Sequence, residues 1–110
     1  MLFRSSKQRQ LEADRKRVED LRNIGNAIKV WHEKNGAVPA ALSDLNSHVT
    51  DPETGAAYEY HPKTGTAYEL CANFFSAESG DRRAAYPSNL WEHGRGRSCF
   101  ALDASKPVPY

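Results

Sequence analysis

The first apolar pattern along the chain has the period of an α-helix. Between residues 7 and 35 the apolar positions recur at steps of three, four or seven: Leu11, Val18, Leu21, Ile24, Ile28 and Trp31. This spacing places them on one stripe of a helix with about 3.6 residues per turn. Asn35-Gly36 is a strong stop, because glycine after the last turn takes the left-handed conformation that satisfies the free carbonyls. We predict a helix from about Lys7 to Asn35, with core residues Leu21, Ile24, Ile28 and Trp31.

Charged residues dominate the N-terminal half of this helix. They occupy most positions from 12 to 22: Glu12, Asp14, Arg15, Lys16, Arg17, Glu19, Asp20 and Arg22. Because charged side chains favour solvent, we predict that this half projects from the domain while the second half packs. Gly25 lies in the second half and costs about 1 kcal/mol relative to alanine, so we expect the close approach of a packed strand there.

A short helical turn is predicted after the long helix. Pro39 suits the first position of a helix, and Leu42 and Leu45 are one three-residue step apart. We expect both leucines to pack under the long helix as part of the core. Asp51-Pro52 then interrupts the chain, since the residue before proline is pushed into extended geometry.

The phrase T-G-x-A-Y-E occurs twice and predicts a β-hairpin. Residues 54–59 are TGAAYE and residues 64–69 are TGTAYE. In each copy a glycine suited to positive φ precedes an alternating segment, 57–60 in the first and 67–74 in the second. Residues 61–65 have the length of an ordinary hairpin loop. Alternation gives two apolar sets, with Cys71 facing away from the second: Tyr58 and Tyr60, then Tyr68, Leu70, Ala72 and Phe74.

A third strand is predicted near the C-terminus. Residues 98–102, SCFAL, bring Cys99 beside Cys71 and place Phe100 in the core. The polar stretch 76–97 has the length of a functional or tethered loop, and we interpret Trp91 within it as a lid. The tail, about 104–110, is expected to fray. The predicted fold class is α+β, a single domain over residues 1–110 with one long N-terminal helix on a small antiparallel sheet of three to four strands.

Length and charge narrow the class of protein. A chain of 110 residues with 39% hydrophobic and 26% charged residues has the size of one small soluble domain, with a modest core that needs extra bracing. A net charge of +1 argues against a strong non-specific nucleic-acid binder, so we expect no nucleic-acid partner. No apolar run approaches the roughly 18 to 20 residues of a membrane span, and the first residues lack the apolar stretch of a signal peptide.

The two cysteines, Cys71 and Cys99, are candidates for the extra bracing. An even cysteine count in a small domain fits a disulfide, and closing a loop of about 29 residues would stabilise the fold by roughly 3 to 4 kcal/mol in the chain-entropy model. Such a bond requires an oxidising compartment. Two buried free thiols in a cytosolic protein are the alternative.

Residues that could carry out catalysis or bind a metal ion are few. Cys71 and His93 could pair as nucleophile and base, but nothing supplies an orienting acid or an oxyanion donor, so we expect no enzyme activity. The spacing of histidines and cysteines lacks C-x-x-C and H-x-x-x-H, which argues against zinc. Asp51 and Glu53 on a tight turn are a candidate calcium site, although they lack the alternate-residue ligand pattern. We interpret the arginines at 82–83 and 95–97 as solvated loop ends, and we expect no cofactor.

The order of these segments resembles the soluble domains of type IV pilins and of the pseudopilins of type II secretion systems. The likeness begins in residues 14–45, DRKRVEDLRNIGNAIKVWHEKNGAVPAALSDL, where a charged helix and an aromatic residue precede N-G-x-x-P-x-x-L-x-x-L. It continues in DPETGAAYEY, in YELCANF and in W-x-H-G-x-G-x-x-C-F. Together these pieces cover most of residues 14–102.

The resemblance implies a helix packed on a small antiparallel sheet, a variable region closed by a disulfide between Cys71 and Cys99, and an extracytoplasmic location. It implies a non-catalytic protein at the periplasmic face of the inner membrane, whose partners are other proteins, such as pilin-like subunits or secretion components, in a pilus or secretion-related assembly.

The sequence departs from pilins at its N-terminus. It lacks the prepilin peptidase site and the apolar half-helix that inserts in the membrane, and we interpret about residues 1–10 as the stub of a removed anchor or as disordered. Contact with a membrane would then come only through an anchor missing from this chain. The alternative interpretation is a soluble binding module, unrelated to pilins, whose charged helix docks a partner helix.

Overall fold

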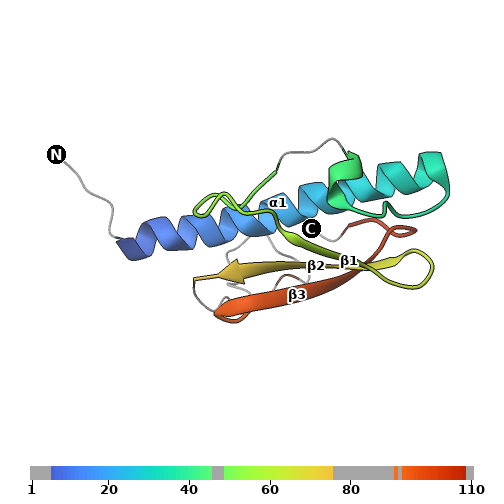
Figure 1. Ribbon diagram of the computed structural model, residues 1–110. Helices are drawn as coiled ribbons and strands as arrows, with labels where there is room; N and C mark the ends of the chain where they lie inside the picture. Colours follow the sequence, from blue (N-terminus) through green and yellow to red (C-terminus); the bar gives the residue numbers. More distant parts are fainter. Residues whose placement is uncertain (1–5, 46–48, 76–90, 92, 109–110) are drawn as a thin grey trace.

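One long helix lies across one face of a small antiparallel sheet (Figure 1). The computed structural model describes residues 6–45, 49–75, 91 and 93–108. Its elements are the helix α1 (Ser6–Asn35), the 3-10 helix η1 (Leu42–Leu45) and the strands β1 (Glu59–Pro62), β2 (Ala67–Phe74) and β3 (Gly96–Asp103). The predicted α+β class is confirmed, as are the long helix and the short helical turn after it.

Among the described residues the sheet has three strands in the order β1-β2-β3, and both pairs are antiparallel. β1 pairs with β2 from Glu59↔Cys71 to Pro62↔Tyr68. β3 pairs with the whole of β2, from Ala67↔Asp103 to Phe74↔Gly96. The central strand therefore extends past β1, and in the described part of the chain residues 72–74 have no partner strand on that side.

Each copy of the duplicated phrase forms a turn that leads toward the sheet. Gly55 has a φ of 74° and Gly65 a φ of 69°, the left-handed region that glycine adopts without steric cost. The first turn is closed by a bridge between Thr50 and Ala57, and the second joins β1 to β2. The repeat is thus architectural. The predicted first strand, 57–60, lies two residues before β1, since His61 and Pro62 belong to β1 and not to the loop.

The core lies between α1 and the inner face of the sheet. Of the predicted core residues, seven belong to its buried cluster: Leu21, Ile24, Ile28, Tyr58, Tyr68, Leu70 and Phe100. Leu42 and Leu45 are only partly buried and pack against this cluster from η1. Val18, Phe74 and Leu102 complete much of the remainder. The period-two alternation of β2 accounts for this arrangement, because it turns residues 68, 70, 72 and 74 toward the helix.

Neither tryptophan has its predicted role. Trp31 is only partly buried and lies outside the core cluster, so its assignment to the core is wrong. At about 100° per residue it lies about 80° around the helix from Leu21, at the margin of the apolar stripe. Trp91, predicted as a lid, is fully buried, and its ring centroid is 5.0 Å from that of Phe100. The rest of the predicted loop 76–97 lies outside the described residues up to position 92, apart from Trp91.

The segment after β3 packs back onto the helix. Ala104 is buried and Val108 is partly buried, so fraying from about residue 104 is wrong for this stretch. A Cβ atom on Gly25 would lie 3.0 Å from Val108 Cγ2 and 3.2 Å from the Tyr68 hydroxyl. The close approach expected at Gly25 is confirmed, and the tail contributes to it together with β2.

Candidate functional site

The outer face of the sheet, away from α1, carries the disulfide. Cys71 and Cys99 are directly opposite each other in the β2–β3 register, with Cα atoms 4.0 Å apart, and their sulfurs are bonded. The predicted disulfide is confirmed, and the alternative of two free thiols is wrong. Cys71 is fully buried while Cys99 is exposed. We call this region the disulfide face and define it by its members: Glu59, His61, Glu69, Cys71, Arg97 and Cys99.

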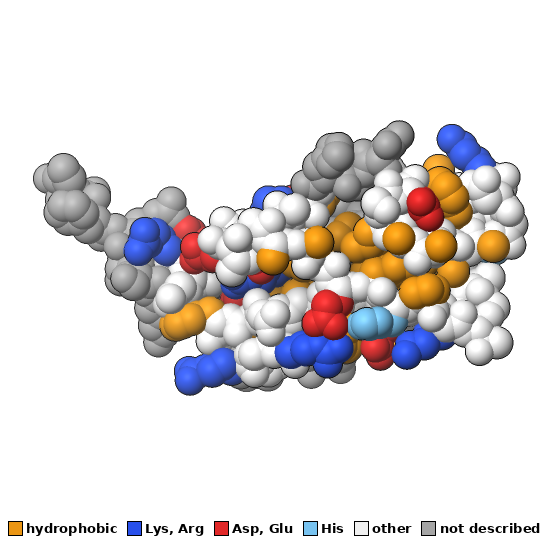
Figure 2. Space-filling model, viewed as in Figure 1, with side chains coloured by type: hydrophobic (Ala, Val, Ile, Leu, Met, Phe, Trp, Pro, Cys, Tyr) orange, Lys and Arg blue, Asp and Glu red, His pale blue; other side chains and the backbone are white. Residues whose placement is uncertain are grey.

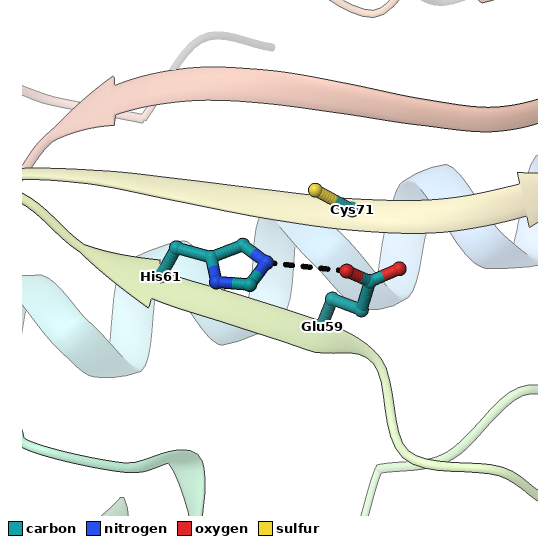
Figure 3. A group of neighbouring side chains, drawn as sticks. All are labelled: Glu59, His61 and Cys71. Atoms are coloured by element: carbon teal, nitrogen blue, oxygen red, sulfur yellow. Dashed lines mark hydrogen bonds and ion pairs between the residues drawn. The ribbon is translucent and has the colours of Figure 1, made fainter.

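An ion pair crosses the disulfide face above Cys71. Arg97 on β3 donates to both carboxylate oxygens of Glu59 on β1, at 2.7 and 2.8 Å. Because β2 lies between these strands, the pair passes over it, and Arg97 Nη2 is 3.7 Å from Cys71 Sγ. His61 Nε2 lies 3.1 Å from Glu59 (Figure 3). Hydrogen bonds from Arg97, and then from His61, lower the pKa of Glu59 to about 2.

The disulfide face brings together side chains of types that can bind a metal ion. Ligand atoms of Glu59, His61 and Cys71 all lie within 4.8 Å of one another, and so do those of Glu69, Cys71 and Cys99. The two groups share Cys71 Sγ. They come from three strands, so no linear spacing motif could reveal them. With the sulfurs bonded to each other, neither group presents a thiolate.

The candidate pair of nucleophile and base is not brought together. Cys71 is consumed in the disulfide and points to the outer face. His93 stacks on Phe74, with ring centroids 3.6 Å apart, and Phe74 belongs to the core on the helix side of the sheet. The two side chains therefore lie on opposite sides of β2.

A buried ionic cluster ties the N-terminal half of α1 to the turn at residues 51–54. Arg17 is 5% exposed and donates to Asp14 at 2.7 Å and to Asp51 at 2.6 and 3.0 Å. Asp14 also accepts a hydrogen bond from the backbone N–H of Phe75. The prediction that this half of the helix projects is therefore wrong from Ala13 onward, because buried partners hold its charged side chains. We call Asp14, Arg17, Asp20, Asp51 and Tyr58 the Arg17 cluster.

The candidate calcium ligands serve other purposes. Both oxygens of Asp51 accept from Arg17, and one also accepts the backbone N–H groups of Glu53 and Thr54. Although burial raises the pKa of Asp51, these hydrogen bonds outweigh it and lower the pKa. The Glu53 side chain is exposed. The hypothesis of a calcium site at Asp51 and Glu53 is not supported, because a guanidinium occupies the position a cation would need.

The same cluster holds the first copy of the repeat against the helix. The Tyr58 hydroxyl donates to Asp20 at 2.7 Å, and Lys16 bonds the other oxygen of that carboxylate. Burial, and then the bond to Asp20, raise the pKa of Tyr58. Tyr68, at the same place in the second copy, has no hydrogen-bond partner for its buried hydroxyl among the described residues. The two tyrosines share a sequence context but not an environment.

Hollows in the described part of the chain adjoin the Arg17 cluster. One, of about 110 Å³, lies between the 51–58 turn and the end of β2. The other, of about 350 Å³, is lined by Gln10, Glu53 and Phe75 and shares Arg17 and Asn73 with the first. Since Arg17 is already paired with Asp14 and Asp51, it offers neither hollow an uncompensated charge for an anion.

On the face seen in the space-filling view, charged and histidine side chains gather in the lower half, over the sheet, beneath a band of apolar side chains (Figure 2).

The fold defines a small α+β domain with a cross-strand disulfide. No family model, no curated protein and no solved structure matches the chain in comparisons with known proteins. In the part of the chain that is described, no helix is both long and apolar enough to span a bilayer.

Proposed function

We propose that the chain is a non-catalytic, pilin-like domain of an extracytoplasmic compartment that acts through protein–protein contacts. The Cys71–Cys99 disulfide is the observation that carries this proposal. Stable disulfides form in oxidising compartments and are rare in reducing ones. A long amphipathic helix on an antiparallel sheet, in the segment order described above, is the architecture that the pilin resemblance implies.

We favour contacts with other proteins because the reactive and charged groups of the candidate site already bond to one another within the fold. The sulfurs are bonded to each other, and Arg17 and Asp51 neutralise each other. What the described surface offers instead is strand edges: the outer edges of β1 and β3, and the end of β2 beyond β1. Val30 and Phe75 are large apolar side chains that stay exposed among the described residues. We propose pilin-like subunits or secretion components as partners.

The packing of α1 disfavours the alternative of a helix-docking module. The apolar stripe that would receive a partner helix is already covered, with Leu21 and Ile28 fully buried against the sheet. A partner helix would have to dock on the polar face, where Val30 is the exposed large apolar residue.

The compartment is tested by trapping the thiols in the host cells. Free thiols are blocked in intact cells with a membrane-permeant maleimide, and the protein is then reduced and labelled with a polyethylene-glycol maleimide. We expect a shift by two labels only after reduction, together with cleavage of the protein by a protease added to spheroplasts. Two thiols blocked before reduction, in a protein protected from the protease, would overturn the proposed location.

The contact function is tested by photo-crosslinking in the same cells. A photoreactive amino acid is placed at Ala101, exposed on β3, and at the matched control Asn23, exposed on α1. We expect position 101 to link to a pilin-like subunit or secretion component and position 23 to link to it less. Equal labelling from both positions, or products containing only cytosolic proteins, would contradict a sheet-edge contact.

A further inference from the structure

We propose that reduction of the Cys71–Cys99 disulfide converts the disulfide face into a binding site for Zn²⁺. The ligands would be the thiolates of Cys71 and Cys99, the imidazole of His61, and one carboxylate from Glu59 or Glu69. This inference goes beyond the proposed function and does not rest on it, since it concerns the purified chain in either location.

The sheet places these five side chains together without the disulfide. Cys71 on the central strand is directly opposite Glu59 on one side and Cys99 on the other. His61 and Glu69 face each other one step along the same face. Strand pairing sets these positions through backbone hydrogen bonds, so the grouping depends on the ladder and not on the sulfur–sulfur bond.

Each of the two groups of three brings its own ligand atoms near the spacing of a tetrahedral zinc site. Within each of the two groups the ligand atoms lie no more than 4.8 Å apart. Zinc bonds of about 2.0 to 2.3 Å place tetrahedral ligands about 3.3 to 3.8 Å from one another, so the ligand atoms within each group must move closer by about 1 Å, and the two groups join through the Cys71 sulfur that they share. Thiolate, imidazole and carboxylate are the donors that Zn²⁺ takes in proteins.

The redox and proton balance of the conversion is simple. A dithiol reductant gives two electrons and two protons to the disulfide, leaving two cysteine thiols and its own disulfide. Zn²⁺ then replaces the two thiol protons, which pass to solvent, and neutral His61 binds through a ring nitrogen. No other oxidant or reductant is involved.

Arg97 supplies the outer charge that such a site needs. Two thiolates and one carboxylate exceed the charge of Zn²⁺ by one negative unit, and Arg97 already lies against Glu59 and 3.7 Å from Cys71 Sγ. Partners behind the ligands orient them and tune the metal. Because its side chain is 54% exposed, Arg97 can move aside without leaving a buried charge unpaired.

Equilibrium metal binding by the purified protein tests the proposal. The oxidised and the fully reduced protein are each titrated with Zn²⁺ against a chromophoric chelator, and with Co²⁺ as a spectroscopic probe. We expect one Zn²⁺ per reduced chain, with the sulfur-to-cobalt charge-transfer band and the intense visible bands of tetrahedral Co²⁺, and no comparable binding by the oxidised chain. Equal binding in both states would overturn the proposal, since it would exclude the thiols as ligands.

Variants test whether Zn²⁺ binds to the complete set of ligands or to the two thiols alone. His61→Ala should weaken Zn²⁺ binding by the reduced protein at least tenfold, while the matched control His32→Ala, on α1, should leave it unchanged. Glu59→Gln and Glu69→Gln identify the carboxylate, because only one should weaken binding. A reduced protein that binds Zn²⁺ as tightly with Ala at position 61 would show two sulfurs acting alone, and the proposal would fail.

Circular dichroism covers the case in which the reduced chain unfolds. If reduction abolishes the fold, added Zn²⁺ should restore the native far-ultraviolet spectrum in the wild-type chain and not in His61→Ala, because binding is then coupled to folding. A reduced, unfolded chain whose spectrum Zn²⁺ does not restore would count against the site.

Discussion

Arg17 keeps its charge in a nearly dry position because three carboxylate oxygens accept its hydrogen bonds. The pairing with Asp51 is bidentate, which is the geometry that a guanidinium matches best. Hydrogen bonding to Asp51 outweighs the effect of burial and raises the pKa of Arg17. Removing the guanidinium of such a group takes a counter-charge away from buried carboxylates, so its cost is far larger than that of a surface pair.

Replacement of Arg17 by Met should therefore be severe. We expect Arg17→Met to lower the free energy of unfolding by about 3 to 5 kcal/mol, since Asp14 and Asp51 are left as buried anions. The measurement is urea unfolding followed by circular dichroism. The control Lys29→Met breaks an ion pair with Glu33 on the solvent side of the same helix and should cost at most about 0.5 kcal/mol. Similar losses in the two variants would contradict the burial argument.

The duplicated phrase offers a second comparison between matched residues. Tyr58→Phe removes a hydrogen bond to the carboxylate of Asp20 and should cost about 1.5 to 3 kcal/mol. Tyr68→Phe removes a buried hydroxyl that has no partner among the described residues, and it should cost nothing or stabilise slightly. Thermal unfolding of the two variants beside wild type gives the answer. A larger loss for Tyr68→Phe would mean that its hydroxyl has a partner elsewhere in the chain.

At the scale of single residues, the sequence predicts apolar burial better than polar burial. Period and alternation identified Leu21, Ile28, Tyr58 and Leu70. Asp14 and Arg17 read as solvated, because the carboxylate that pairs with Arg17 lies 34 positions away, on a turn whose placement no local pattern fixes. One signal was available: Asp14 lies four residues before the stripe residue Val18, and Arg17 lies four residues before the stripe residue Leu21.

Among the elements, β3 is tied at its end to the turn between β1 and β2. Asp103, the last residue of β3, accepts hydrogen bonds from the Thr66 hydroxyl at 2.6 Å and from the Ser105 backbone N–H at 2.8 Å. The hydroxyl of Ser105 donates to the same oxygen. Hydrogen bonds from Ser105, and then from Thr66, lower the pKa of Asp103 to about 2.

This tie should depend on pH in a defined direction. Because the folded pKa lies below the unfolded value of about 3.9, Asp103 stabilises the fold above about pH 4, and the contribution is lost as the pH falls toward 2. We expect wild type to be more stable than Asp103→Asn at pH 6, and the difference to shrink between pH 4 and pH 2. Urea unfolding of both proteins across this range measures it, and Glu59, common to both, cancels. A difference that stays constant across the range would contradict the assignment.

The elements themselves were largely predictable, and their ends were less so. The helix, the hairpin and the third strand follow from the spacing of apolar residues in the sequence, and the structure has all three. The predicted first strand stops short of Pro62 because proline favours loops, whereas Pro62 closes the ladder opposite Tyr68 on an edge strand, where a missing N–H costs little. The disulfide face was missed as a cluster, since strand pairing and not sequence spacing assembles it.

For the molecule as a whole, the disulfide should supply a large share of the stability. Cys71 and Cys99 are 28 positions apart, and closing such a loop is worth about 3 to 4 kcal/mol in the chain-entropy model. We expect the Cys71→Ala/Cys99→Ala double variant to lose about that much free energy of unfolding. Urea unfolding of this variant beside the oxidised wild type checks the value. Wild type reduced in the presence of a chelator is the control and should lose a similar amount, whereas a loss below about 1 kcal/mol would assign the stability to the core alone.

The position of the Arg17 cluster also limits how the helix can sit. If apolar contacts alone held α1, the helix could slide along the sheet by one turn, about 5.4 Å, and make similar contacts before and after. The bidentate hydrogen bonds from Arg17 to Asp51 do not tolerate such a shift, because they are directional. The cluster thus fixes the position of α1 along the sheet. A partner that binds the N-terminal end of α1 would therefore be held at a fixed position relative to the sheet.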